Sequence, residues 1–443
     1  MAYRLQDLEP FLKEPEPYKC KTCPYCNGTR DPTVKYPKLP PFEWYASIGN
    51  PRFVMAPMVD QSELPFRMMG RKYGTTLCYT PMLNSRVFAM DPEYRKHNYS
   101  TCAEDRPLVV QFCGNEADVV LAAARVVEGD CDAVDINLGC PQGIAKKGFY
   151  GSYLMERWDV VHTILHTLSV ELKVPVIAKM RVFDSEELTL RYARMIRDAG
   201  AHLIAVHGRT REMKGQQTGV ADLALVARVK QEITDRPVLS NGNIECYDDA
   251  VANLKTTGCD GVMAAEGMLW DPRIFANPER PIKTGRRFTA DKPTRLDAIA
   301  AAREYMEFAK RYPTPFANVK SHVFKIVHHS LEVVPEFRAH MGRIPGTKPM
   351  TEMLAKVLDD LEAADRERGP DGPYEKRKRD REGAIATAAA VAAASGDAAS
   401  PTGSRPAAPA CTKDGDADDV GGHPETPVPG DAEQPARPQP EAA

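Results

Sequence analysis

Apolar runs and amphipathic stretches alternate regularly between Arg52 and Gly267, and this alternation constrains the fold more than any other feature. We expect strands at residues 53–58, 75–81, 108–112, 133–138, 176–180, 203–207, 238–241 and 261–265. Helical patterns fill most of the intervals, at 64–73, 117–128, 158–172, 186–199, 221–233 and 247–255. Such alternation predicts an α/β fold with a closed (β/α)8 TIM barrel. No GxGxxG motif follows a strand, which disfavours an open doubly wound sheet.

The regions outside the barrel separate by composition. We expect an N-terminal extension with a Cys-rich segment (1–50), the barrel (51–280), a small all-helical domain (281–368) and a disordered C-terminal tail (369–443). Apolar stripes at 297–312, 316–330 and 350–364 predict the helices of that domain. Residues 384–443 contain no Phe, Trp, Tyr or Leu, so they cannot bury enough apolar surface to offset chain entropy. Residues 82–106 predict a long irregular loop over the barrel mouth.

The net charge of −3 conceals an uneven distribution. Taken alone, it argues against a strongly basic nucleic-acid-binding protein. However, residues 384–443 hold nine acidic and three basic residues, whereas residues 281–350 hold 13 basic and six acidic ones. A basic helical domain beside a barrel mouth favours contacts with the phosphates of a folded RNA. A solvated helix face is the other interpretation of the same charges.

Polar side chains follow most of the predicted strands, at the ends where barrels of this kind carry their active sites. Gln111 and Lys179 offer the amide and the cation that the edge of a flavin ring requires. The loops after the seventh and eighth strands, residues 241–243 and 266–267, lie where such barrels bind phosphate. We therefore expect a bound FMN, with His207 at its ribityl or phosphate edge or at a substrate carbonyl.

Cys140 differs from other cysteines of the chain because it lies in a loop, between Gly139 and Pro141. Cysteines inside strand-like runs, such as Cys78 and Cys113, are expected to be buried thiols that pack in the core. Free thiols of this kind are typical of proteins in a reducing compartment. If a flavin delivers hydride to one carbon of an activated C=C bond, the neighbouring carbon needs a proton. An ordinary thiol, with a pKa of about 8.5, is mostly protonated at neutral pH and can act as a general acid. We assign this role to Cys140.

These strand ends resemble those of the tRNA-dihydrouridine synthases, FMN-dependent enzymes that reduce uridine in tRNA. The resemblance is carried by Ala56-Pro57-Met58, Gln111-Phe112, Asn137-Leu138-Gly139-Cys140-Pro141, Lys179-Met180-Arg181, His207-Gly208-Arg209 and Asn241-Gly242-Asn243. The segments Val59-Asp60-Gln61-Ser62-Glu63, Cys78-Tyr79-Thr80-Pro81-Met82 and Ala265-Glu266-Gly267 resemble the eukaryotic branch that acts on D-loop uridines 16 and 17. The resemblance covers residues 50–280 closely and the helical domain loosely.

The resemblance implies an oxidoreductase that reduces the C5=C6 bond of specific D-loop uridines to 5,6-dihydrouridine. NADPH or NADH would reduce FMN, flavin N5 would pass hydride to C6 of a flipped-out uracil, and Cys140 would protonate C5. The residues implied to hold FMN are Pro57, Met58, Val59, Gln111, Asn137, Lys179, His207, Asn241, Gly242, Asn243, Ala265 and Glu266. We expect tRNA contacts from Arg86, Arg181, Arg209, Lys320 and Lys325, although Arg86 and Arg209 could equally be charges of the barrel rim.

The sequence departs from the family pattern at two places. Many bacterial members have Asn-Gly-Asp where this chain has Asn241-Gly242-Asn243, and Gly-Arg where it has Glu266-Gly267. The second change puts a carboxylate near the phosphate, so we expect backbone contacts there.

The alternative function is a barrel flavoenzyme that reduces a small pyrimidine or an enone, which would need no basic domain. A catalytically inactive RNA-binding barrel is a third, and Cys140 and Lys179 argue against it.

The N-terminal segment holds Cys20, Cys23 and Cys26 in a CxxCxxC pattern that lies outside the family motifs. An iron–sulfur motif of the ferredoxin type would need a further cysteine where Arg30 stands. Three thiolates and a distant histidine could bind zinc, but a structural zinc site needs four ligands. We therefore assign no metal ligand, and reactive or inert loop thiols are the favoured interpretation.

Segments that direct a protein to a membrane or a compartment are scarce in this sequence. No stretch approaches the roughly 20 apolar residues of a membrane helix, and the polar N-terminus is unlike a signal peptide. We expect a cytoplasmic monomer without a membrane partner. Lys376-Arg377-Lys378-Arg379 could direct nuclear import or could be the solvated end of the helical domain, and the sequence favours neither.

Overall fold

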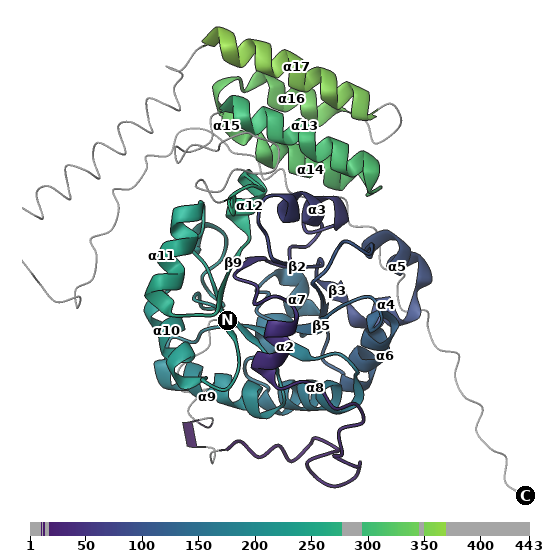
Figure 1. Ribbon diagram of the computed structural model, residues 1–443, viewed down its shortest axis with the longest axis vertical. Helices are drawn as coiled ribbons and strands as arrows, with labels where there is room; N and C mark the ends of the chain where they lie inside the picture. Colours follow the sequence, from purple (N-terminus) through teal and green to yellow (C-terminus); the bar gives the residue numbers. More distant parts are fainter. Residues whose placement is uncertain (1–9, 11, 14–16, 277–294, 345–349, 369–443) are drawn as a thin grey trace, which may run out of the picture. The chain divides into compact units, whose positions relative to one another are not determined.

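The computed structural model describes residues 10, 12–13, 17–276, 295–344 and 350–368. Parallel strands close into a barrel, because β1 pairs with both β2 and β9, and β2 pairs with β4. The barrel strands are β1 (Phe53–Met55), β2 (Leu77–Tyr79), β4 (Leu108–Cys113), β5 (Ala133–Leu138), β6 (Val176–Arg181), β7 (Ile204–His207), β8 (Val238–Asn241) and β9 (Gly261–Ala264). Each coincides with a predicted run to within three residues. The predicted TIM barrel is therefore confirmed (Figure 1).

The interior of the barrel is filled by apolar side chains that every barrel strand or its flanking residues supply. This cluster contains Val54, Ala56, Leu77, Tyr79, Val109, Ala133, Ile177, Leu203, Ala205, Leu239 and Met263. A short helix, α2 (Pro41–Ser47), adds Trp44 and Tyr45 to it. The Tyr45 hydroxyl donates to the carbonyl of Pro51, directly before β1. Helix α2 therefore closes the N-terminal end of the barrel, opposite the strand ends that carry the polar residues.

The helices that cover the barrel follow the predicted amphipathic stretches closely. They are α3 (Leu64–Lys72), α6 (Ala117–Val127), α8 (Trp158–Glu171), α9 (Glu186–Asp198), α10 (Leu223–Glu232) and α11 (Tyr247–Thr257). The prediction of an irregular loop at 82–106 was wrong. That stretch contains β3 (Leu83–Asn84), α4 (Ser85–Met90) and α5 (Pro92–Asn98). Both helices are too short to show periodicity, but Asn84 and Asp91 cap their first turns by accepting backbone hydrogen bonds.

The predicted helical domain is also confirmed. It comprises α13 (Arg295–Arg311), α14 (Phe316–Ile326), α15 (His328–Val333), α16 (Glu336–Arg343) and α17 (Met350–Arg368). The single helix predicted at 316–330 divides into α14 and α15 at Val327. Helix α13 packs against α14 and α17, and it also packs against α3 of the barrel. The predicted disordered tail and the basic run at 376–379 lie outside the described residues.

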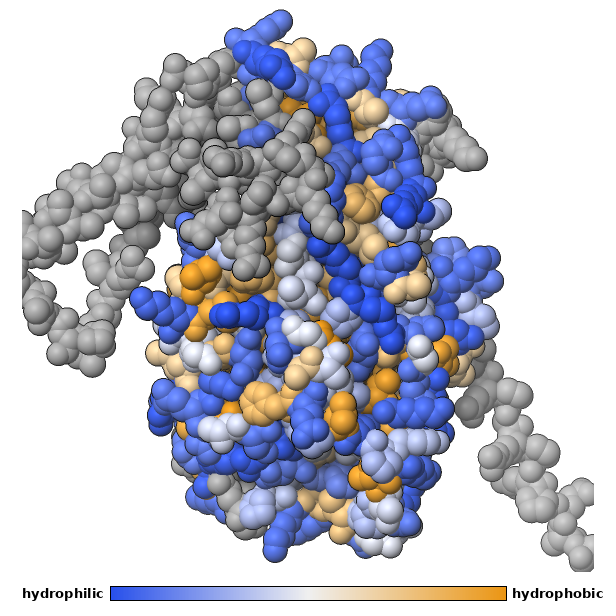
Figure 2. All heavy atoms as spheres, in the orientation of Figure 1, coloured by the Kyte–Doolittle hydropathy of each residue, from blue (hydrophilic) through white to orange (hydrophobic). Residues whose placement is uncertain are grey.

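The surface carries few large apolar areas on the face that Figure 2 shows. Hydrophilic side chains cover most of this face, and hydrophobic ones form small, separate patches (Figure 2). Within the part of the chain that the structure describes, no helix has the length and apolar character needed to cross a bilayer.

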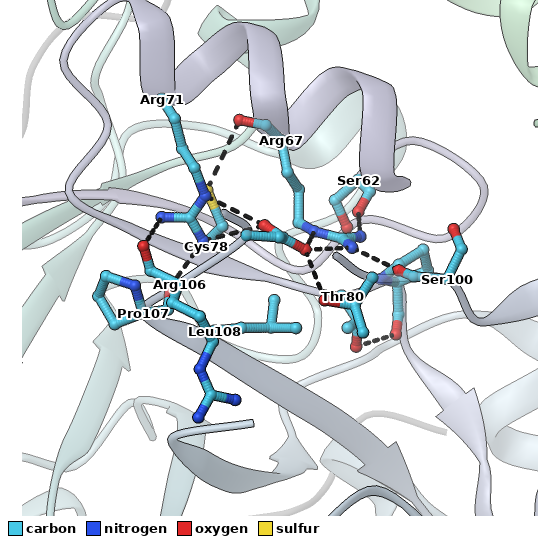
Figure 3. Close-up of polar contacts among 12 residues, drawn as sticks. Ser62, Arg67, Arg71, Cys78, Thr80, Ser100, Arg106, Pro107 and Leu108 are labelled. Carbon is cyan, nitrogen blue, oxygen red and sulfur yellow. Dashed lines mark hydrogen bonds and ion pairs between the residues drawn. The ribbon is translucent and has the colours of Figure 1, made fainter. Parts of the chain in front are cut away.

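A buried ion-pair network fixes α3 to the loop before β4 (Figure 3). The Arg67 guanidinium lies 2.6 Å from a carboxylate oxygen of Asp105, and neither side chain is more than 1% exposed. Arg67 also donates to the carbonyl groups of Ser62 and Ser100, each at 2.7 Å. Arg71 pairs with the other carboxylate oxygen of Asp105 at 3.0 Å. Each charged group is thus paired and hydrogen-bonded, as burial requires.

A second buried group joins α3 to the helical domain. Glu63, directly before α3, accepts a hydrogen bond from the Tyr305 hydroxyl at 2.7 Å, and its other oxygen lies 2.9 Å from His322 Nε2. The Phe66 ring stacks on His322 with 4.1 Å between ring centroids. Burial would raise the pKa of Glu63, but His322 and Tyr305 outweigh it and lower that pKa. We call these residues, together with Arg67, Arg71 and Asp105, the junction.

Candidate active site at the barrel mouth

A cavity of about 510 Å³ opens at the C-terminal ends of the strands. Most of the residues predicted to hold FMN or to act in catalysis line it. They are Pro57, Val59, Gln111, Asn137, Cys140, Lys179, His207, Asn241, Gly242, Asn243, Ala265 and Glu266. Met58 is the exception, because its side chain is buried in the hydrophobic core. The structure therefore brings residues from seven strand ends, spread over more than 200 positions of the sequence, to one cavity.

Gln111 is held by a chain of side-chain hydrogen bonds across β4 and β5. Its Nε2 donates to Asp135 Oδ2 at 2.6 Å, and its Oε1 accepts from Asn137 Nδ2 at 2.8 Å. Gln111 and Asp135 are both fully buried. Burial raises the pKa of Asp135 well above its usual value, although Gln111 and Lys179 oppose this shift. Sequence reasoning missed Asp135, whose signal was a carboxylate inside an otherwise apolar strand.

The loop that carries Cys140 is fixed on both sides of the thiol. Asn137 Oδ1 accepts hydrogen bonds from the backbone N–H groups of Gly139 and Cys140, at 3.0 and 2.8 Å. The carbonyl of Cys140 accepts from both the backbone N–H and the hydroxyl of Ser152. At Gly151, with φ of +65°, a Cβ would lie 2.7 Å from that carbonyl oxygen. These contacts hold the half-buried Cys140 at the cavity wall.

Lys179 is a buried cation of the cavity wall. Its ammonium has no hydrogen bond or ion pair among the residues described, although Asp135 and Cys140 lie close enough to attract it. Burial is the main cause that lowers the pKa of Lys179 to about 8, and repulsion from Arg181 adds to it. A ligand that presents an anionic edge or a hydrogen-bond acceptor would supply the missing partner.

His207 is a neutral imidazole. Burial lowers its pKa well below the usual value, and the nearby charges of Lys179, Arg181 and Arg209 lower it further. Arg209 Nη1 lies 3.0 Å from His207 Nε2. A guanidinium can only donate, so Nε2 is the acceptor and the ring proton is on Nδ1. His207 can therefore donate one hydrogen bond from Nδ1.

The two arginines predicted to contact tRNA at the mouth are used to order its loops. Arg181 donates to the carbonyl groups of Gly139 and Thr210, at 2.7 and 2.6 Å. Arg209 donates to His207 and, at 3.2 Å, to Asn243 Oδ1. Both line the cavity. Contacts between them and tRNA stay a prediction.

The other three residues predicted to contact tRNA do not line the cavity. Arg86, on α4, pairs with Glu116. Lys320 donates to the carbonyl of Gly342 at 2.6 Å, within the helical domain. Lys325 Nζ donates to Gln61 Oε1 at 2.9 Å, next to the junction, and is attracted by Glu266 of the cavity wall. Of the three, Lys325 therefore comes nearest to the mouth.

The loops after β8 and β9 approach the cavity with their backbones. Asn241 donates from its side chain to the carbonyl of Met263 at 2.8 Å, and Asn243 bonds both backbone groups of Ala221 at 2.9 Å. Gly242 has a φ of +132°, which favours glycine. At Gly267, a Cβ would lie 2.4 Å from the carbonyl oxygen of Ile244. The two glycines thus let these loops pack closely against neighbouring segments at the cavity wall, where a larger side chain would collide with them.

Comparison with known proteins agrees with this geometry. The model of the family "Dihydrouridine synthase (Dus)" matches residues 54–362, which include the barrel and most of the helical domain. The mouse "tRNA-dihydrouridine(16/17) synthase [NAD(P)(+)]-like" protein is 42% identical over 312 residues, covering 70% of this chain and 62% of its own length. The Saccharomyces cerevisiae "tRNA-dihydrouridine(16/17) synthase [NAD(P)(+)]" is 43% identical over 333 residues, covering 73% and 77%.

A more distant relative differs in its named positions. The human "tRNA-dihydrouridine(20a/20b) synthase [NAD(P)+]-like" protein is 35% identical over 250 residues, covering 56% of this chain and 77% of its own. The chain spans less than two thirds of the mouse relative. The family match extends over more than half of the chain. The protein therefore belongs to the dihydrouridine synthase family.

Proposed function

We propose that this protein is an NAD(P)H-dependent tRNA-dihydrouridine synthase that reduces uridines 16 and 17 of the D-loop. The observation that carries the proposal is one cavity at the barrel mouth, with the thiol of Cys140 in its wall beside Lys179, a cation that has no ion pair among the described residues. The named activities of the mouse and yeast relatives support the substrate class and the positions. The reductant in their names is NAD(P).

The residues of the mouth fit an FMN cofactor. The cavity volume of about 510 Å³ lies within the usual range for cofactor sites. Lys179 and the free amide hydrogen of Gln111 would bind the polar edge of the ring system. Gly242 and Gly267 both line the cavity, so backbone N–H groups of their loops would be the donors to a phosphate. When bound and reduced by NADPH or NADH, FMN would supply the hydride that C6 of uracil accepts.

Cys140 completes the reduction by supplying the second hydrogen. Addition of hydride to C6 leaves negative charge at C5 and on the adjacent carbonyl, and the thiol of Cys140 donates its proton to C5. The resulting thiolate is attracted by Lys179 and regains a proton from solvent. Asn137, which binds the backbone N–H of Cys140 at 2.8 Å, keeps the thiol at a fixed place in the wall.

The helical domain supplies the contacts that distinguish tRNA from a free pyrimidine. Residues 281–350 carry 13 basic and six acidic residues, and Lys325 lies beside the mouth. Phosphate contacts of this kind position an RNA while a single base leaves its stack and enters the cavity. The alternative, a flavoenzyme for a small pyrimidine or enone, gives no role to this concentration of charge.

Two half-reactions test the proposal with the purified full chain. We expect the protein to release FMN on denaturation and to be reduced by NADPH without oxygen. Unmodified tRNA should then reoxidise the flavin at least a hundredfold faster than free uridine at equal concentration. Equal rates with the two oxidants would support the small-molecule alternative. Protein that cannot be loaded with FMN would contradict the cofactor assignment.

A further inference from the structure

The N-terminal Cys-rich segment meets a histidine of the barrel's outer layer. Residues 17–40 form neither helix nor strand, and in Figure 1 this purple segment passes α8. The ligand atoms of Cys23, Cys26 and His162 all lie within 4.8 Å of one another. His162 is on α8, more than 130 positions after the cysteines. None of these three residues lines the mouth cavity.

Cys20 supplies a fourth ligand of the right kind. The thiols of Cys20 and Cys23 both interact with the imidazole of His162. Cys20 also lies 3.8 Å from the hydroxyl of Thr163, the next residue of α8. Cys20 and Cys23 are buried, and His162 is only 4% exposed. The buried Nδ1 of His162 has no hydrogen-bond partner among the described residues.

The backbone of the segment is folded as a thiolate ligand requires. The backbone N–H groups of Thr22 and Cys23 lie near the sulfur of Cys20, and those of Tyr25 and Cys26 lie near the sulfur of Cys23. Two consecutive turns therefore direct their N–H groups at sulfur, which stabilises negative charge there. A tetrahedral zinc with Zn–S bonds of about 2.3 Å separates two sulfurs by about 3.8 Å. The ligand atoms of Cys23, Cys26 and His162, all within 4.8 Å of one another, need only a small adjustment to reach this geometry, and the sulfur of Cys20 would move in as the fourth ligand.

The segment is also held against the barrel around the cluster. Arg30 pairs with Asp118 of α6 at 3.0 Å, and Lys35 pairs with Glu171 of α8 at 2.8 Å. The His166 ring stacks on His162 with centroids 5.4 Å apart, one helical turn further along. Apolar packing here is limited to the small cluster of Cys20, Cys23, Tyr25 and Val170 with Tyr18. A cross-link would add to these contacts in fixing a segment that has only a small apolar cluster.

We propose that Cys20, Cys23, Cys26 and His162 form a structural zinc site that fixes the N-terminal segment to helix α8. Three thiolates and one imidazole are a usual tetrahedral set for zinc, with no position left for substrate. The site lies outside the mouth, and it leads through residues 27–40 to α2, which closes the bottom of the barrel. The metal therefore supports the fold and takes no part in uridine reduction.

Metal analysis of the purified full chain tests the proposal. We expect about one zinc ion per chain, and a loss of at least tenfold in Cys23→Ser and in His162→Gln. His166→Gln is the matched control, because this partly buried histidine stacks on His162 from the same helix but is not a ligand. Its zinc content should equal that of the wild type. Equal zinc content in His162→Gln and His166→Gln would overturn the ligand assignment.

Cobalt substitution keeps the test decisive if a variant folds poorly. Wild-type protein stripped of metal and given Co²⁺ should show the strong visible bands of tetrahedral cobalt with thiolate ligands, and Zn²⁺ should abolish them. Absence of zinc together with absence of these bands would refute the site. A Cys23–Cys26 disulfide found by mass spectrometry of freshly purified protein would also refute it. Flavin content, measured in the same samples, separates these outcomes from any failure of the proposed activity.

Discussion

The barrel mouth and the junction both concentrate buried polar side chains, but they differ in how those groups are paired. At the junction, Arg67, Asp105 and Glu63 all have partners within the protein at 2.9 Å or less. At the mouth, Lys179 has no counter-ion among the described residues, and Asp135 Oδ1 has no hydrogen-bond partner there. The charged groups of the junction are thus paired within the protein, although His322 Nδ1 has no hydrogen-bond partner among the described residues. The mouth instead leaves a charged group, Lys179, without a partner of this kind, which a ligand could provide.

This difference indicates that the junction stabilises the fold, whereas the mouth serves the reaction. An unpaired buried polar group costs about 1–3 kcal/mol, so a fold that keeps one needs a functional reason. Removing one member of a buried ion pair lowers the stability of the fold strongly, because the other member is then left without a partner. Changes at the mouth should therefore alter activity with little effect on folding, and changes at the junction should do the opposite.

The largest expected effect is on catalysis, in Cys140→Ala. Loss of the general acid should reduce the rate of uridine reduction in tRNA by about 10²–10⁴-fold, while NADPH still reduces the flavin at the wild-type rate. Initial rates of dihydrouridine formation and stopped-flow absorbance measure the two steps. Cys102→Ala, at a half-buried thiol away from the cavity, is the control. Wild-type turnover in Cys140→Ala would remove this residue as the acid.

The next effect is on stability, in Asp105→Asn. This change leaves Arg67 and Arg71 without their shared carboxylate in a buried place, and it should lower the free energy of unfolding by about 3–5 kcal/mol. Urea denaturation measures this loss. Asp118→Asn, which breaks an exposed ion pair with Arg30, should cost less than about 1 kcal/mol. If the two variants were equally stable, the distinction between the junction and the surface would fail.

The smallest effect is a change in pH dependence, in Glu63→Gln. The pKa of Glu63 is lower in the folded protein than in the unfolded chain, so its carboxylate adds stability above the unfolded pKa of about 4.3. That contribution is lost as the pH falls through the folded pKa, where His322 and Tyr305 lose their acceptor. Denaturation measured between pH 6 and pH 3 should therefore show a smaller fall in the free energy of unfolding for Glu63→Gln than for the wild type. Parallel curves would contradict the assigned shift.

Many residues of the mouth could be predicted, because the alternation of apolar and amphipathic stretches in the sequence shows where each strand ends. Once the alternation of strands and helices is recognised, the C-terminal ends converge by topology, and Gln111, Lys179 and Cys140 are among their residues. The roles of Arg181 and Arg209 in ordering loops could not be predicted. Their partners are backbone carbonyl groups and an asparagine whose positions depend on loop conformation.

The junction and the cluster of Cys23, Cys26 and His162 could not be predicted from the sequence, for a different reason. Glu63 and His322 are 259 positions apart, and no local periodicity connects α3 with α14. The three cysteines were visible as a motif, but their histidine lies on α8 among ordinary apolar helix residues. Contacts of this kind depend on how helices pack, which a single sequence does not record.

Dihydrouridine mapping in cells is the most direct test of the central claim, that this mouth reduces D-loop uridines in tRNA. In cells that lack the protein, positions 16 and 17 should be uridine, and the wild-type chain should restore dihydrouridine at both. Cys140→Ala, expressed at the same level, should leave them unmodified. Unchanged dihydrouridine at positions 16 and 17 in the absence of the protein would contradict the account.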